Sequence, residues 1–177
     1  MKILAICGSL RAASLNAMLL RAVVRIAPRD IHVYLSQGIG DLPLFNPDIE
    51  TAHPLSVTRL RAEIMAADAL IIASPEYAHG VTGAIKNALD WMVGNESFVN
   101  KPVALLNASP RATHAQAALR EILLTMSAHV VDAAYVAVPM LGANIEEEGV
   151  VQHTEIRAAL LTSLRLLQAA ALTKIGQ

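Results

Sequence analysis

The sequence KILAICGSLRAASLN occupies residues 2–16 and has the order of a buried strand, a turn and the start of a helix. Residues 2–7 form an apolar run of strand length, and Gly8 permits a tight turn out of it. Ser14 is a good N-cap, and Leu15 begins a series of apolar residues at helical spacing. A strand followed at once by a helix is the repeating unit of α/β proteins, so this stretch predicts that class.

Strand-like and helix-like segments alternate along the rest of the chain. Further strands are predicted at residues 31–35, 69–74 and 102–107 and within residues 130–138, and apolar residues at helical spacing predict helices between them. Five strands joined through helices indicate a parallel sheet with helices on both faces. We expect the doubly wound strand order 2-1-3-4-5 in a single domain of residues 1–177, with a ligand beyond strands 1 and 3. A dinucleotide-binding fold of the same class is the alternative, and it needs a sixth strand that is not evident.

The composition limits the partners and the compartment. Hydrophobic residues make up 54% of the chain and the net charge is −1, which fits a sheet buried on both faces and argues against a nucleic-acid partner. The single cysteine excludes a disulfide within the chain and favours a reducing compartment. The first apolar run is too short for a signal peptide, and we expect no stretch long and apolar enough to cross a membrane. These features predict a cytoplasmic protein.

The loop after the first strand has the chemistry of a phosphate site. Ser9, Ser14 and Asn16 offer side-chain hydrogen bonds, Arg11 offers a charge-assisted one, and the helix start offers free N–H donors. The alternative is a capped helix with a solvated arginine. The loop contains neither Gly-x-Gly-x-x-Gly nor Gly-Lys-Ser/Thr, so a dinucleotide fingerprint and a triphosphate loop are disfavoured.

The loop after the third strand, residues 75–83, lies on the other side of the expected ligand position. Gly80 and Gly83 would let the backbone approach a flat ring, and Tyr77 would rest against the ring edge. The alternative is an ordinary turn with a surface tyrosine.

The two loops together resemble a known family. Gly8-Ser9-x-Arg11-x-x-Ser14-x-Asn16, with Pro75-Glu76-Tyr77 and Gly83-x-x-Lys86-Asn87-Ala88-Leu89-Asp90-Trp91, is similar to the NAD(P)H-dependent FMN reductases, which include quinone, azo-dye and chromate reductases. The resemblance implies a flavodoxin-like fold, an FMN cofactor, NADPH or NADH as electron donor, and a homodimer or homotetramer. It also implies a set of FMN-contacting residues: Ser9, Arg11, Ser14, Leu15, Asn16, Pro75, Glu76, Tyr77, Ala78, Gly80, Ser109 and Arg111.

The chain departs from the family pattern at three places. Ala78 stands where the family usually has asparagine, and Thr82 replaces the usual proline but can still cap a helix. The third loop, residues 108–115, lacks the paired glycines that are common there. Ser109 and Arg111 are its implied flavin contacts.

The leading functional hypothesis is an FMN-dependent oxidoreductase that takes hydride from NAD(P)H and passes electrons to a small acceptor such as a quinone. The flavin carries the chemistry, so no catalytic side chain is assigned. A flavodoxin-type electron carrier is the first alternative, although such carriers are usually strongly acidic and flank the ring with aromatics. A scaffold that has lost its cofactor is the second, and the glycine-poor third loop is its support.

Four further interpretations follow from single residues. The apolar composition, with Trp91 and Met92 at the end of the predicted helix 84–91, indicates an oligomer. The six histidines show no close ligand spacing, which argues against a metal site, although His79 and His114 fall in the two loops nearest the flavin. Cys7 is interpreted as a core residue, and residues 146–148, three glutamates, as a solvated turn.

Overall fold

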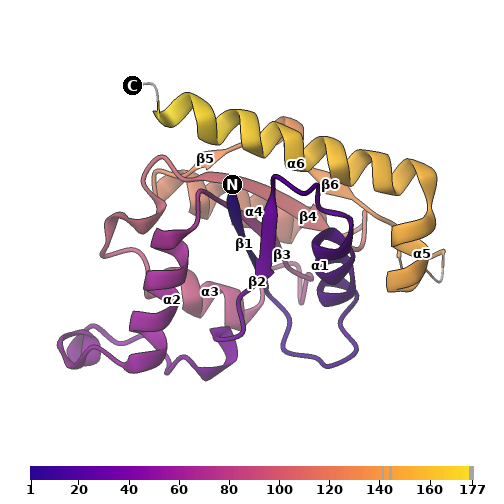
Figure 1. Cartoon of the computed structure of the whole chain (residues 1–177). Coiled ribbons are helices and arrows are strands. Elements are labelled where there is room, and N and C mark those ends of the chain that lie inside the picture. The colour runs from indigo at the N-terminus through magenta and orange to yellow at the C-terminus, as the bar shows by residue number, and fades with distance from the viewer. Residues whose placement is uncertain (141, 144, 176–177) are drawn as a thin grey trace.

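A single parallel sheet organises the structure, a computed structural model that describes residues 1–140, 142–143 and 145–175 (Figure 1). The strand order is β2-β1-β3-β4-β5, and a further short strand, β6, also pairs with β4. Every pairing is parallel, with Ile3 opposite Val33 and Ala5 opposite Ile71. The predicted doubly wound order is therefore confirmed. The strands are β1 Lys2–Cys7, β2 His32–Leu35, β3 Ala69–Ala73, β4 Pro102–Asn107, β5 His129–Val130 and β6 Val136–Ala137.

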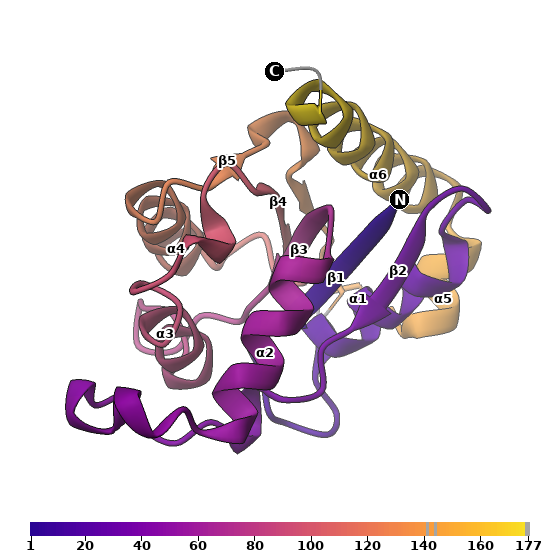
Figure 2. The ribbon, with the colours of Figure 1, turned by 60° about the vertical axis from the view of Figure 1, so that its left-hand side comes forward.

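Helices cover both faces of this sheet, as Figure 2 shows. Alternate residues of each strand point to opposite faces, so Ile3 and Ala5 pack with α1 and α6, whereas Leu4 and Ile6 pack with α2, α3 and α4. The central strands are buried on both sides, which accounts for the apolar composition. The helices are α1 Leu15–Ile26, α2 Leu55–Ala66, α3 Gly83–Asp90, α4 Thr113–Thr125, α5 Glu147–Gln152 and α6 Thr154–Ile175.

The predicted fifth strand is not continuous. Between the pairs Val103–Val130 and Leu106–Val136, β4 advances by three residues while the other strand advances by six. The additional residues form a 3-10 turn, η4 (Asp132–Ala134), whose carbonyl Ala134 O accepts a hydrogen bond from Ser163 Oγ on α6 at 2.6 Å. Residues 130–138 thus contain strand as predicted, but in two short pieces, because the turn between them satisfies its own backbone groups and anchors on the covering helix.

Helix α6 contradicts the expectation that no segment could span a membrane. Residues 154–173 have the length and composition to do so, with a mean hydropathy of 1.2, and 28% of that stretch is buried. In this fold α6 lies across the sheet (Figure 1) and buries Leu160, Leu164 and Leu167 in the core it shares with α1. The apolar side chains of α6 thus serve to cover the sheet within this domain.

Trp91 and Met92 do not form an exposed patch. Each is only 1% exposed, and Trp91 Nε1 donates a hydrogen bond to Pro43 O at 2.8 Å. The ring of Phe45 meets the indole edge-on at 5.1 Å between centroids. The prediction that Trp91 and Met92 supply an exposed apolar patch for an oligomer interface was therefore wrong.

Candidate cofactor site

Three loops meet at the carboxyl ends of β1, β3 and β4 and enclose a cleft of about 330 Å³. This is the end of a parallel sheet at which open α/β folds place their ligands. Of the twelve residues implied by the resemblance, Ala78 and Gly80 are absent from the cleft wall and the other ten are in it. The wall consists of Ser9, Arg11, Ala13, Ser14, Leu15, Asn16, Pro75, Glu76, Tyr77, Ala108, Ser109, Arg111 and Ala112.

Gly8 is required for close packing rather than for a tight turn. A Cβ at this position would lie 2.2 Å from Ser74 Oγ and 2.6 Å from Ser74 Cβ, far inside contact distance. Its backbone N–H donates to Ala73 O at 2.8 Å, and its carbonyl accepts a buried hydrogen bond from Thr82 Oγ1 at 2.6 Å. Since no described glycine has a positive φ, the predicted conformational reason was wrong. Gly8 lets the first loop lie directly against the start of the second.

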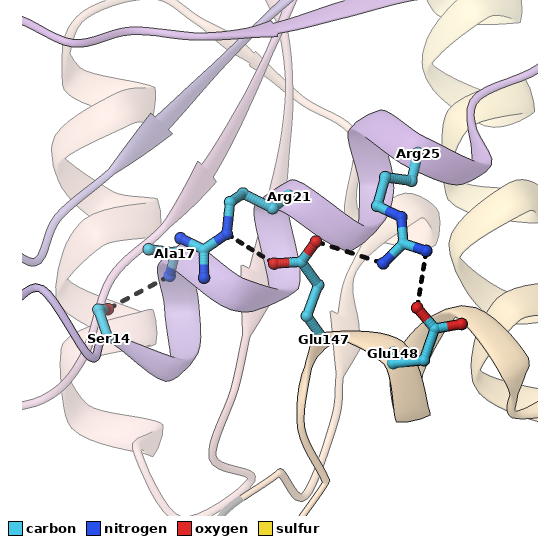
Figure 3. A network of polar contacts seen from close by, with 6 residues as sticks. All are labelled: Ser14, Ala17, Arg21, Arg25, Glu147 and Glu148. Atoms are coloured by element: carbon cyan, nitrogen blue, oxygen red, sulfur yellow. Dashed lines mark hydrogen bonds and ion pairs between the residues drawn. The ribbon is translucent and has the colours of Figure 1, made fainter.

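Ser14 caps the N-terminus of α1, which borders the cleft. Its backbone is extended (φ −75°, ψ 125°), and its Oγ accepts a hydrogen bond from Ala17 N at 3.2 Å, as predicted for an N-cap (Figure 3). The N–H groups of Leu15 and Asn16, earlier in the same turn, have no acceptor within the helix. They are available, with the positive end of the helix dipole, to an anion in the cleft.

Asn16 joins the first loop to the third, a structural role that was not predicted from the sequence. The residue is buried, and its Oδ1 accepts a hydrogen bond from Ala108 N at 3.2 Å. The side chain therefore braces the third loop against the first, and its Nδ2 group is the part able to donate to a ligand.

The second loop is a tight hairpin turn. Tyr77 and Gly80 exchange backbone hydrogen bonds of 3.1 and 3.0 Å, while Ala78 and His79 both have left-handed backbones with φ of 49° and 59°. This is the geometry of a type I′ turn, which favours asparagine or glycine at its centre. It explains physically why asparagine is usual at position 78. A Cβ on Gly80 would meet Tyr77 O at an ordinary 3.7 Å, so packing within the protein does not require a glycine here. The close approach of this backbone to a flat ring stays a prediction.

Glu76 caps a helix. Its Oε2 accepts a hydrogen bond from Ala115 N at 2.8 Å, in the first turn of α4, whose own N-cap residue Ala112 supplies no side-chain bond. A carboxylate at a helix N-terminus is favourable because it satisfies a free N–H and complements the dipole. Glu76 thus ties the second loop to the third.

The third loop is closed by Asn107 in place of glycines. This buried residue ends β4, and its Oδ1 accepts from Ser109 N at 2.9 Å while its Nδ2 donates to Ala112 O at 3.5 Å. Ser109 and Arg111 are held in the cleft wall by this arrangement. Asn107 was not among the predicted site residues, although a polar residue at the end of a buried strand is a signal that the sequence contains.

Ion pairs join α1 to α5 (Figure 3). Glu147 contacts Arg21 at 2.6 Å and Arg25 at 3.4 Å, and Arg25 also reaches Glu148 at 2.7 Å. The hydrogen bond to Glu148 raises the pKa of Arg25, and the same bond lowers the pKa of Glu148. The interpretation of residues 146–148 as a solvated turn was therefore wrong for Glu147 and Glu148, which begin a helix held on α1.

The donors of the cleft fit a phosphate ester joined to a flat ring. Ser9 and Ser14 carry hydroxyls, and Arg11 forms no ion pair with any residue in the described part of the chain. Pro75 and Tyr77 add flat, largely apolar surface. A charged guanidinium near a helix N-terminus suits a dianion, and the wider cleft suits an aromatic ring.

This fold and this cleft define a flavodoxin-like flavoprotein. The sequence model of the NADPH-dependent FMN reductase family matches residues 1–142, and the chain belongs to that family. It is accordingly an FMN-dependent enzyme that oxidises NAD(P)H, which confirms the resemblance seen in the two loops and disfavours the electron-carrier alternative.

Individual relatives agree with this assignment. The chain is 32% identical over 173 residues to the NAD(P)H-dependent FMN reductase of Pseudomonas aeruginosa, covering 94% of this chain and 93% of the relative. It is 33% identical over 139 residues to the quinone reductase of Escherichia coli K12, covering 75% and 74% of the two chains. The structure of FerB, a flavoenzyme NAD(P)H:(acceptor) oxidoreductase from Paracoccus denitrificans, superposes with a TM-score of 0.80 at 28% identity, covering 96% of this chain and 98% of FerB.

Proposed function

We propose that this enzyme holds FMN in the three-loop cleft, takes hydride from NADPH or NADH there, and delivers the electrons to a small acceptor of the quinone type. The observation that carries the proposal is the convergence of Ser9, Arg11 and Ser14 with Pro75 and Tyr77 on one cleft. When bound, FMN supplies the redox chemistry, and the protein supplies binding and orientation.

The proposed contacts divide into two groups. Ser9, Arg11, Ser14 and the N-terminus of α1 hold the phosphate, because they combine hydroxyl donors, a guanidinium and free N–H groups. The flat ring lies along the second and third loops. Asn16 is a proposed phosphate contact as well, and Leu15 beside it is a proposed FMN contact. The ring-side contacts proposed are Pro75, Glu76, Tyr77, Ala78, Gly80, Ser109 and Arg111.

The quinone acceptor is supported by the quinone reductases among the relatives. A scaffold that has lost its cofactor gains no support, because the glycine-poor third loop is closed by Asn107 and still contributes to the cleft.

A titration tests the cofactor assignment. We expect FMN to bind at about one per chain and riboflavin, which lacks the phosphate, to bind at least about tenfold more weakly, the effect of one charge-assisted contact. Equal affinity for the two flavins would contradict the phosphate site.

Steady-state kinetics test the shared ring face. Nicotinamide and acceptor must each bring their reacting atom to within about 3–3.5 Å of the flavin, so two flat molecules at one face must alternate. Initial rates with a quinone at several fixed NADPH concentrations should give parallel double-reciprocal lines. Intersecting lines in the absence of substrate inhibition would indicate a ternary complex and a second pocket.

A homodimer or homotetramer is also proposed. The apolar composition supports it, and so do large exposed apolar side chains such as Leu44 at 84% and Val93 at 65%. Light scattering at micromolar concentration should return at least twice the mass of one chain, and a single-chain mass would contradict the proposal.

A cytoplasmic location is proposed as well, since the single cysteine suits a reducing compartment. Cell fractionation should recover the protein with cytoplasmic markers, and recovery with membranes would instead point to a role for α6 outside this fold.

A further inference from the structure

Two histidines from separate loops meet beside the cleft. The ring centroids of His79 and His114 lie 4.4 Å apart with their planes at 45°, and both residues are exposed. His79 belongs to the hairpin whose Tyr77 lines the cleft. His114 lies near the end of the third loop, where α4 has begun, and Arg111 of that loop also lines the cleft. The pair therefore bridges two of the three loops that form the site.

The backbone holds this pair in place. His79 is fixed in a left-handed turn by the two hydrogen bonds between Tyr77 and Gly80. His114 lies in the first turn of α4, and its neighbour Ala115 is bound by Glu76 at 2.8 Å. Because Glu76 precedes the hairpin directly, a single contact sets the spacing of the two elements that carry the imidazoles.

The element that carries His114, with Arg111 three residues before it, favours an anion. The N-terminus of α4 presents its positive dipole end, and Arg111 keeps its charge throughout the neutral range. Glu76 is the opposing carboxylate, and it is engaged with the helix N–H. A protonated imidazole carries a positive charge and donates from both ring nitrogens, and two imidazoliums in contact repel each other. An anionic group placed across both rings relieves that repulsion, so its binding is coupled to proton uptake.

We propose that His79 and His114 together bind an anionic substituent, a sulfonate or carboxylate, on aromatic electron acceptors that use the cleft. The inference rests on the proposed function, because it concerns which acceptors the flavin site serves. On this proposal the histidine pair determines acceptor specificity, and its preference for anionic acceptors over uncharged ones increases as the pH falls.

A redox-inert probe tests the anion site without turnover. Calorimetric titration of the FMN-loaded protein with 2-naphthalenesulfonate should give a Kd that rises about tenfold from pH 5.5 to pH 8, the effect of losing about one charge contact. In His79→Gln and His114→Gln the rise should fall below about twofold, whereas His129→Gln, an exposed histidine at the opposite end of the sheet, should behave as the unaltered protein.

Turnover then links the site to acceptors. The readout is the ratio of KM for 1,2-naphthoquinone-4-sulfonate to KM for uncharged 1,2-naphthoquinone, which should rise with pH only where both histidines are present. A pH-independent Kd for the probe, or an equal rise in both histidine variants, overturns the inference even if both quinones are reduced. Failure of NAD(P)H to reduce either quinone overturns the proposed acceptor class instead, while the probe titration still decides the anion site.

Discussion

Replacing Gly8 by alanine should damage stability and cofactor binding together. The new Cβ would lie 2.2 Å from Ser74 Oγ and 2.6 Å from Ser74 Cβ, so the end of β1 must move away from the end of β3. Overpacking of a well-packed interior costs about 1–3 kcal/mol. In a chain of this length that lowers Tm by about 2–12 °C.

The same displacement should weaken FMN binding. The carbonyl of Gly8 accepts the buried hydrogen bond from Thr82, which starts α3 and so links the first and second loops. We expect the displaced first loop to lose about one hydrogen bond to FMN, worth about 0.5–1.5 kcal/mol, which corresponds to a Kd for FMN about two- to twelvefold higher. Differential scanning calorimetry and flavin fluorescence titration measure the two effects.

Two further variants make this reasoning testable. Gly38 has a negative φ, and a Cβ added to it would meet nothing within 4 Å, so Gly38→Ala should leave Tm and FMN affinity unchanged. Ser74→Gly removes the two side-chain atoms that the new Cβ would meet. In the Ser74→Gly protein, adding Gly8→Ala should therefore lower Tm much less than Gly8→Ala lowers it in the unaltered protein. If Gly8→Ala behaved like Gly38→Ala, or if the double variant gave no recovery, the close-packing explanation would be refuted.

Three other substitutions probe separate features. Arg11→Ala should raise the Kd for FMN by about 10- to 150-fold, the effect of a charge-assisted contact of about 1.5–3 kcal/mol, with Tm unchanged. The exposed Arg59→Ala is its control, and equal FMN affinity in the two variants would remove Arg11 from the phosphate site. Ala78→Asn should stabilise by about 0.5–1 kcal/mol, because asparagine tolerates the left-handed backbone better, and calorimetry would contradict this if Tm fell. The hydrogen bonds from Arg120 lower the pKa of Asp132, so this carboxylate stabilises the fold at neutral pH and loses that effect as the pH falls through its folded-state pKa. Asp132→Asn should therefore lower Tm slightly at pH 7, with the difference closing below about pH 4; a constant difference would show that the charge is not involved.

Local sequence signals carried most of the fold. The order of apolar runs, Ser14 as an N-cap, and the glycines and prolines that end segments were sufficient to predict the strands and the helices α1 to α4 and α6, because each of these signals acts over a few residues. The strand order followed from the packing rule for alternating strands and helices. The interrupted fifth strand was not predictable in this way. Its turn is anchored by Ser163, which lies 29 residues from Ala134 along the chain.

The candidate site shows the same division between local and distant effects. The residues of the cleft wall in the first loop are recognisable from chemistry alone, since a phosphate needs hydroxyls, a guanidinium and free N–H groups. The bracing contacts of Asn16 with Ala108 and of Glu76 with Ala115 span 92 and 39 residues, and no pattern in one sequence pairs them. For the same reason the meeting of His79 with His114 became visible only in three dimensions.

The position of α6 has a consequence for biosynthesis. Leu160, Leu164 and Leu167 cover the sheet face formed by alternate residues of β1, β3 and β4, yet α6 is made after every strand that it covers. A ribosome adds roughly 5–20 residues per second, so the 22 residues of α6 take roughly 1–4 s to appear. Throughout that interval the part of this apolar face that α1 does not cover stays exposed, and exposed apolar surface of this kind is what chaperones bind and what drives aggregation. Slowing translation within α6 should therefore reduce the yield of native enzyme more than slowing it within α2, which packs on the opposite face.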